Sequence, residues 1–178
     1  MKLYEQKELH CHFVVLCPDF NLGHLRSTVS SITGSYPQSG ITAVLSEEVH
    51  PDDLADAQKV CKTVKAGKSI TGMINAGLKE GGQEWNLVVV AGSWLRGWVI
   101  RKMSNFVESE YDILFPVVDR RYLFKEATIN GILIHRKAFD AVGPMADNNP
   151  IEVCKMMWEL DAKEKGCKFK AVVGCQIM

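Results

Sequence analysis

The sequence predicts an α/β protein in which helices cover both faces of a mostly parallel central sheet, a three-layer α/β/α sandwich. Two observations carry this prediction. Short, continuously apolar runs, which are typical of buried parallel strands, alternate with windows in which apolar residues recur at helical spacing. Such alternation implies that successive strands pair in parallel through right-handed helical crossovers.

The expected strands are short apolar runs bounded by turn residues. The run at 12–17 (HFVVLC) ends at Pro18, and the run at 87–90 (LVVV) is the most buried in character. A strand covered on both faces needs apolar side chains on both, so these runs favour interior positions. The full set of expected strands is 12–17, 41–45, a short one near Val64, 87–90, 113–118, 131–134 and 169–173.

The expected helices follow the strands. Apolar residues at 22, 25, 29, 32 and 36 share one helical face, and Pro37 ends that helix. Pro51 opens a second helix with an acidic first turn, which suits the positive end of the helix dipole. Later helical faces comprise Ile70, Met73, Ile74 and Leu78; Val99, Met103, Phe106 and Val107; and Ile151, Cys154, Met157 and Trp158.

Bulk properties narrow the class of protein. The 178 residues fit a single domain over 1–178, since domains usually run about 100–200 residues. Formal net charge is zero, which argues against a nucleic-acid binder. No apolar run is long enough to span a membrane, and no signal peptide is evident. The six cysteines form no CxxC pair and fit reduced core residues, so we expect an intracellular, cytoplasmic protein.

In open α/β sheets, ligands bind beyond the carboxyl ends of the strands, where strand order reverses. The segments to search are therefore 18–23, 46–53, 67–75 and 91–96. No GxGxxG follows the first strand and no GxxxxGK[ST] occurs, so the phosphate cradles of Rossmann dinucleotide proteins and P-loop proteins are both missing.

Several short motifs follow one another along the chain. A strand leads into Pro18-Asp19-Phe20-Asn21, and the helix that follows ends near Tyr36-Pro37. The second strand leads into Ser46-Glu47-Glu48, and a helix of small residues carries Asn75-Ala76-Gly77. Later come the stretch 131–136 (GILIHR), then Phe139 and Val142-Gly143, and finally a helix that starts near Glu152 and ends at Gly166.

In this order the motifs resemble the nucleotide-sugar-binding core of a family 2 glycosyltransferase with the GT-A fold, and the likeness covers nearly the whole chain. The resemblance implies a nucleotide-sugar donor, UDP- or GDP-linked, held by the loops after the strands. It also implies a hydroxyl acceptor and an acidic catalytic base at the start of the late helix.

The chain departs from that family at one chemically important place. Where the family carries an Asp-x-Asp metal motif, this chain has Ala91-Gly92-Ser93. A divalent cation prefers carboxylate oxygens, so we expect no Mn²⁺ or Mg²⁺ cofactor and no metal ligands here. The chain also stops soon after its last core strand. Its acceptor site is then either minimal or supplied by a partner, and we expect a homo-oligomer or a partner protein as the binding partner.

The resemblance assigns eight candidate residues to the nucleotide sugar: Pro18, Asp19, Asn21, Glu47, Lys68, Asn75, Ser93 and Trp94. Structural alternatives stay open for several of them. Asn21 precedes Leu22 and is a favoured helix N-cap. Asn75 could serve close packing on the sheet. Lys68 could be an ordinary surface charge, and Trp94 could stack on a ligand or simply plug the site.

Two acidic residues are candidates for the catalytic base, with Glu152 the first choice and Asp147 the second. A general base must be a carboxylate within hydrogen-bond reach of the acceptor hydroxyl. The alternative for Glu152 is structural, because Asn149 as N-cap and Pro150 at the first helical position would place Glu152 at the third, completing a capping-box-like start.

Three functions remain open from the sequence. The first is a small glycosyltransferase that moves a sugar from a nucleotide donor to a hydroxyl. The second is a catalytically degenerate GT-A-like domain that acts as a binding or assembly module. The third is an unrelated doubly wound nucleotide-binding protein.

Overall fold

The computed structural model describes residues 10–107, 110–117, 130–173, 175 and 177. In this part of the chain the strands are β1 (Cys11–Cys17), β2 (Ile41–Ser46), β3 (Lys62–Ala66), β4 (Trp85–Val90), β5 (Ile113–Val117), β6 (Ile132–His135) and β7 (Phe169–Val173). The helices are α1 (Leu22–Ser35), α2 (Pro51–Gln58), α3 (Ile70–Glu80), α4 (Gly97–Val107), α5 (Arg136–Val142) and α6 (Ile151–Glu164).

The strands form one seven-stranded sheet in the order β3-β2-β1-β4-β6-β5-β7. The pairs β2–β3, β1–β2, β1–β4 and β5–β7 are parallel, whereas β6 runs antiparallel to both β4 and β5. The predicted α/β fold with a mostly parallel sheet is therefore confirmed, and the parallel pairing expected for the first four strands is present in full.

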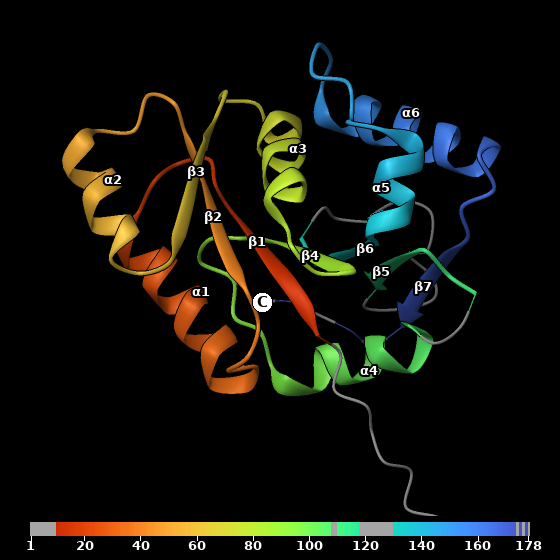
Figure 1. The fold of residues 1–178 in the computed structure, drawn as a ribbon, viewed down its shortest axis with the longest axis horizontal. Coiled ribbons are helices and arrows are strands. Elements are labelled where there is room, and N and C mark those ends of the chain that lie inside the picture. The colour runs from red at the N-terminus through yellow and green to blue at the C-terminus, as the bar shows by residue number, and fades with distance from the viewer. Residues whose placement is uncertain (1–9, 108–109, 118–129, 174, 176, 178) are drawn as a thin grey trace, which may run out of the picture.

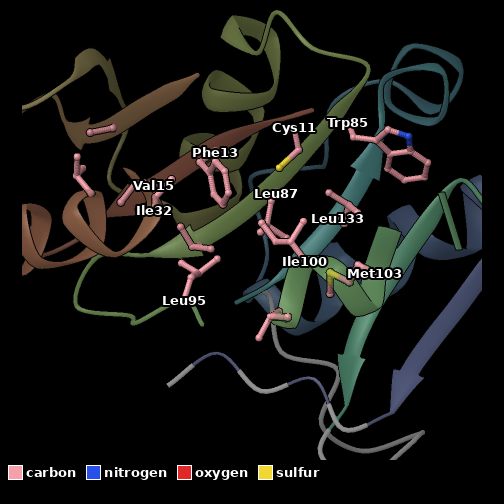
Figure 2. Close-up of a cluster of buried hydrophobic side chains, with 14 of the residues drawn as sticks. Cys11, Phe13, Val15, Ile32, Trp85, Leu87, Leu95, Ile100, Met103 and Leu133 are labelled. Carbon is pink, nitrogen blue, oxygen red and sulfur yellow. The ribbon is translucent and has the colours of Figure 1, made fainter. Parts of the chain in front are cut away.

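Helices cover both faces of this sheet (Figure 1). The core on one face joins odd-numbered residues of β1, such as Phe13 and Val15, to α1, α2 and α4. Figure 2 shows this cluster, with Leu95, Ile100 and Met103 lying near Leu87 and Leu133 of the sheet. The core on the other face joins Val14 and Leu16 to α3, α5 and α6.

The cysteines belong largely to these cores. All six are free thiols, and Cys11, Cys17, Cys154 and Cys175 are buried. Burial raises the pKa of the Cys11 thiol to about 12, because the apolar surroundings disfavour a thiolate. None of the described helices is long and apolar enough to cross a membrane.

The structure differs from the predicted elements in two places. Helix α5 was not predicted, because its seven residues bury only Ala138 and Phe139 and show no apolar period over two turns. His135 caps it by accepting a hydrogen bond from Lys137 N at 3.0 Å. On α6 the buried residues are Cys154, Trp158 and Ala162, so the expectation that Met157 belongs to the inner face is wrong. Position 118, expected to end a strand, lies outside the described residues.

Close packing of α3 on the sheet depends on Gly77. A Cβ at this position would lie 2.1 Å from Val14 Cγ1 and 3.0 Å from Val44 Cγ2. The helix therefore approaches β1 and β2 more closely than any side chain at position 77 would permit.

Gly77→Ala should lower the free energy of unfolding by about 1–3 kcal/mol, because the added methyl group overpacks the contact between α3 and the sheet. Equilibrium unfolding in urea measures the effect. Gly34→Ala on α1 is the matched control, since its Cβ would meet nothing within 4 Å, and it should be neutral or slightly stabilising. Equal losses in the two variants would contradict the packing role of Gly77.

Candidate functional site

The carboxyl ends of β1, β2, β3 and β4 lie along one edge of the sheet because these four strands are parallel. Strand order reverses at β1, which has β2 on one side and β4 on the other. Ligands of open α/β sheets bind in the crevice at such a reversal. The loop from β1 to α1 and the loop from β4 to α4 flank it.

The loop from β1 to α1 holds three of the predicted residues. Pro18 is half-buried and Asp19 is exposed. Asn21 is the N-cap of α1, and its Oδ1 accepts a hydrogen bond from His24 N at 3.0 Å. The capping interpretation of Asn21 is thus confirmed, which leaves Asp19 as the exposed carboxylate on this loop.

The loop from β4 to α4 is held by hydrogen bonds from distant elements. Gly92 N donates to Thr28 Oγ1 at 2.9 Å, and the same hydroxyl donates to Ser93 O at 2.9 Å. Asn130 Nδ2 donates to Ser93 Oγ at 2.9 Å, while Asn130 Oδ1 accepts from Val90 N at 3.0 Å. Ser93 is buried, so its polar atoms serve the protein's own structure.

The residues at this loop do not fit a divalent cation. Ala91, Gly92 and Ser93 supply no carboxylate, and the Ser93 hydroxyl already accepts a hydrogen bond from Asn130. Within the described ranges, no group of three or more His, Cys, Asp or Glu side chains could hold a metal ion.

His24 is a candidate that the sequence did not reveal. A Cβ built on Gly92, where φ is +95°, would lie 3.5 Å from Cγ and Nδ1 of the His24 ring. The imidazole therefore lies beside the loop from β4 to α4. The signal that could have identified His24 is its position in the first turn of α1, three residues after the Asn21 cap.

Trp94 lies on the same loop and is 60% exposed. This side chain does not plug the site, so the packing alternative for Trp94 is wrong. An exposed indole offers an apolar face on which a base or a sugar ring can stack.

Glu47 and Lys68, the predicted residues after β2 and β3, lie on neighbouring loops. Glu47 N donates to Ala66 O at 2.8 Å, which ties the end of β2 to the end of β3. Lys68 Nζ lies 2.5 Å from Glu48 Oε2, with both side chains largely exposed. Such an exposed ion pair contributes little stability, and it partly neutralises Lys68. The carboxylate of Glu47 is exposed.

Asn75 and Asp147 tie the loop after α5 to helix α3. Asn75 Nδ2 donates to Met145 O and Asn75 Oδ1 accepts from Met145 N, both at 2.8 Å. Asp147 accepts hydrogen bonds from Ser69 Oγ and from Thr71 Oγ1, the latter at 2.7 Å. These two hydroxyls lower the pKa of Asp147, which makes it a weaker base. Both residues therefore have clear structural tasks.

Glu152 is exposed in the first turn of α6. The capping arrangement expected around it is wrong. Pro150 is the N-cap, no side chain caps the helix, and Glu152 is the second helical residue. Asn149 instead donates from Nδ2 to Asn148 Oδ1 at 3.0 Å. The carboxylate of Glu152 is therefore not part of a capping box.

A cavity of about 660 Å³ lies elsewhere, between α4 and the edge strand β7. Its lining includes Lys102, Phe106 and Lys170. None of the residues predicted for the nucleotide sugar or for catalysis lines this cavity.

Asn75→Ala should lower the free energy of unfolding by about 1–3 kcal/mol, because it leaves the N–H and C=O of Met145 without their partner. Urea unfolding measures the loss. Lys79→Ala, an exposed position on the same helix, is the control and should change stability by less than about 0.5 kcal/mol. A neutral Asn75→Ala would show that the two hydrogen bonds do not anchor the loop.

Asp147 should make stability depend on pH. Its pKa is lowered in the folded state, so the contribution is complete above the unfolded pKa, about 3.9, and is lost as pH falls through the lower folded-state pKa. Unfolding midpoints of the wild type and Asp147→Asn, compared between pH 2 and 7, should differ above pH 4 and converge at the acid end. A difference that does not change with pH would exclude this linkage.

No protein-family model matches the chain, and no curated protein matches it in sequence. Solved structures match it in fold. The mannosyltransferase PcManGT from Pyrobaculum calidifontis, in complex with GDP-Man and Mn²⁺, gives a TM-score of 0.70 at 8% identity over 93% of this chain. S. aureus TarS gives 0.67 at 10% identity over 95%, and TarS 1-349 gives 0.67 at 11% over 92%.

The chain spans only part of these proteins, namely 56% of the mannosyltransferase chain and 36% and 58% of the two TarS chains. At such low identity the likeness concerns the fold. The seven-stranded sheet with its two helical layers is the fold of GT-A-like glycosyltransferases.

Proposed function

We propose that this chain is a glycosyltransferase-like protein that binds a nucleotide sugar at the carboxyl ends of β1, β2 and β4. The observation that carries the proposal is the meeting of three features where strand order reverses: the amino end of α1, the His24 ring and the exposed Trp94 loop. The mannosyltransferase with the same fold binds GDP-Man, which supports the same ligand class for this chain.

The diphosphate belongs at the amino end of α1. The first turn of this helix has no acidic residue, so its free N–H groups and positive dipole end favour an anion. The corresponding end of α3 already has the Asp147 carboxylate hydrogen-bonded to Ser69 and Thr71. His24 adds a ring N–H donor beside Gly92, in place of the cation that a carboxylate motif would hold.

The remaining candidates surround that anion site. Asp19 and Glu47 are exposed carboxylates on the loops after β1 and β2, and each can accept hydrogen bonds from a base or from ribose hydroxyls. Trp94 offers its indole face to the base or to the sugar. Asn21, Asn75 and Ser93 support the site by fixing loops and not by direct contact, because their side chains are used within the protein.

For transfer, Glu152 is the better candidate base. It would take the proton from the acceptor hydroxyl, whose oxygen then attacks the anomeric carbon while the bond to the diphosphate breaks. Asp147 is less suited, since its hydrogen bonds lower its pKa. Lys68 is not assigned to the diphosphate because Glu48 already pairs with it.

A second function is favoured by the loop after β4. Thr28 and Asn130 satisfy Gly92 and Ser93 internally, so this loop is completed by protein groups where the family resemblance implies a metal-binding carboxylate motif. This observation favours a degenerate GT-A-like domain that binds a nucleotide sugar or assembles with a partner without catalysing transfer.

Isothermal titration calorimetry with UDP- and GDP-sugars, with and without Mn²⁺, tests the binding proposal. We expect one of the donors to bind with an affinity that Mn²⁺ leaves unchanged. His24→Ala should weaken binding about tenfold or more, as expected for a lost hydrogen bond to a charged group. His10→Ala is the control, because His10 is exposed just before the amino end of β1. No binding of any donor, or binding that requires Mn²⁺, would refute the proposal.

Turnover separates the two functions. Release of nucleoside diphosphate from the bound donor, abolished in Glu152→Gln while donor affinity is kept, would identify an enzyme. Tight donor binding without release, in the presence of a range of hydroxyl acceptors, would identify the degenerate module.

A further inference from the structure

The cavity between α4 and β7 follows an edge of the sheet. Strand β7 is an edge strand, because β5 is its only neighbour among the described strands, and it lies at the end of the sheet opposite β3 (Figure 1). All five residues of β7 line this cavity, together with Lys102, Asn105 and Phe106 of α4. The cavity therefore follows the strand over its length, roughly 16 Å. We call the cavity the edge groove.

The register of β7 on β5 decides which of its backbone groups lie at the outer edge. Ile113 of β5 is paired with Phe169, and Ile113 N donates to Lys168 O at 3.1 Å. Alternate residues of a strand bond to the same neighbour. The even-numbered residues of β7 therefore direct their N–H and C=O groups towards β5, whereas Phe169, Ala171 and Val173 direct theirs to the outer edge. A row of this kind is a template for a further strand.

The side chains along this edge differ between the two faces of the sheet. Lys170 lies on the face of α4, where its Nζ is 5.3 Å from the centre of the Phe106 ring. Phe169 packs on the opposite face, and Val173, which shares that face by alternation, is 37% exposed. Lys102 and Lys170 are the charged residues of the edge groove, whose lining contains no carboxylate. A strand laid along β7 therefore meets lysines on one face and apolar side chains on the other.

The carboxylates at the start of β7 do not cancel this positive charge. Glu110 forms an ion pair with Lys168, the residue that precedes the strand. Asp112 accepts a hydrogen bond from Lys168 N at its Oδ2, at 2.9 Å. Lys168 thus engages both carboxylates outside the edge groove, and the lysines inside it attract an acidic ligand.

We propose that the edge groove binds an extended segment of a partner protein in which acidic and apolar residues alternate. The segment adds a strand to the sheet by bonding to the backbone of Phe169, Ala171 and Val173. Its acidic side chains lie on the face of Lys102 and Lys170, and its apolar side chains lie on the opposite face. In strand addition, main-chain hydrogen bonds give affinity and alternate side chains give specificity.

A second copy of this chain is a poorer occupant of the same edge. Pairing of β7 with β7 brings the Lys170 side chains of the two copies towards each other, and like charges on neighbouring strands are destabilising. The edge groove supplies no carboxylate to offset them. Charge complementarity therefore favours an acidic segment from another protein.

Fluorescence anisotropy with labelled synthetic peptides tests the proposal on the whole chain. The probe is an eight-residue peptide of alternating Glu and Val, which we expect to bind. The same peptide with Lys in place of Glu should bind at least tenfold more weakly. Methylation of alternate backbone nitrogens in the Glu-Val peptide should abolish binding, because it removes the main-chain donors.

Ala171→Pro tests the backbone contact from the side of the protein. It removes an N–H that points away from β5, so the ladder between β5 and β7 is kept, and proline is accepted at such positions of edge strands. Binding of the Glu-Val peptide should weaken tenfold or more. Ala171→Ser keeps the N–H and is the matched control, with affinity unchanged within about twofold. Circular dichroism verifies that each variant is folded.

Charge reversal provides an independent measurement. Lys102→Glu combined with Lys170→Glu should make the Lys-Val peptide bind more tightly than the Glu-Val peptide, an outcome that misfolding cannot produce. Absence of binding by the Glu-Val peptide, full binding of its methylated form, or unchanged affinity in Ala171→Pro would overturn the proposal. A dimer in sedimentation velocity that Ala171→Pro dissociates would also overturn it, because the edge would then belong to a second copy.

Discussion

Burial of β1 on both faces is the constraint on which the rest of the arrangement depends. All seven residues from Cys11 to Cys17 are buried, with Phe13 and Val15 in one core and Val14 and Leu16 in the other. A strand of this kind is stable only inside a sheet with helices above and below it. Parallel β2 and β4 on its two sides then reverse the strand order at β1, the topology at which open α/β sheets bind ligands.

The loop after β4 is completed by hydrogen bonds within the protein. The end of β4 is fixed by Thr28 from α1 and by Asn130, which are far from it in sequence. The same groups occupy the polar atoms of Gly92 and Ser93, so the loop needs no external ligand to be satisfied. His24, in the first turn of α1, lies beside this loop, and the proposed anion site rests on it and on the positive end of the helix dipole. Function on a shared fold is decided by such details of the site.

The other candidate residues also differ in whether their side chains are hydrogen-bonded within the protein. Asn75 and Asp147 form hydrogen bonds with groups seventy or more positions away in sequence, and these bonds join α3 to the loop after α5. Glu152 and Trp94, in contrast, are exposed. Exposure without an internal hydrogen-bond partner is what distinguishes a candidate ligand contact from a structural residue.

The sequence by itself determined the elements whose signal is local: the buried strands 12–17 and 87–90, the long helices with an apolar face, and the parallel order that their alternation implies. It also determined that Ala91-Gly92-Ser93 offers no carboxylate. Only the tertiary structure decided the antiparallel direction of β6, the short helix α5, the outward face of Met157 and the position of His24 beside Gly92. The physical reason is that each of these depends on a neighbour distant in sequence, whose contact leaves no periodic pattern in the chain.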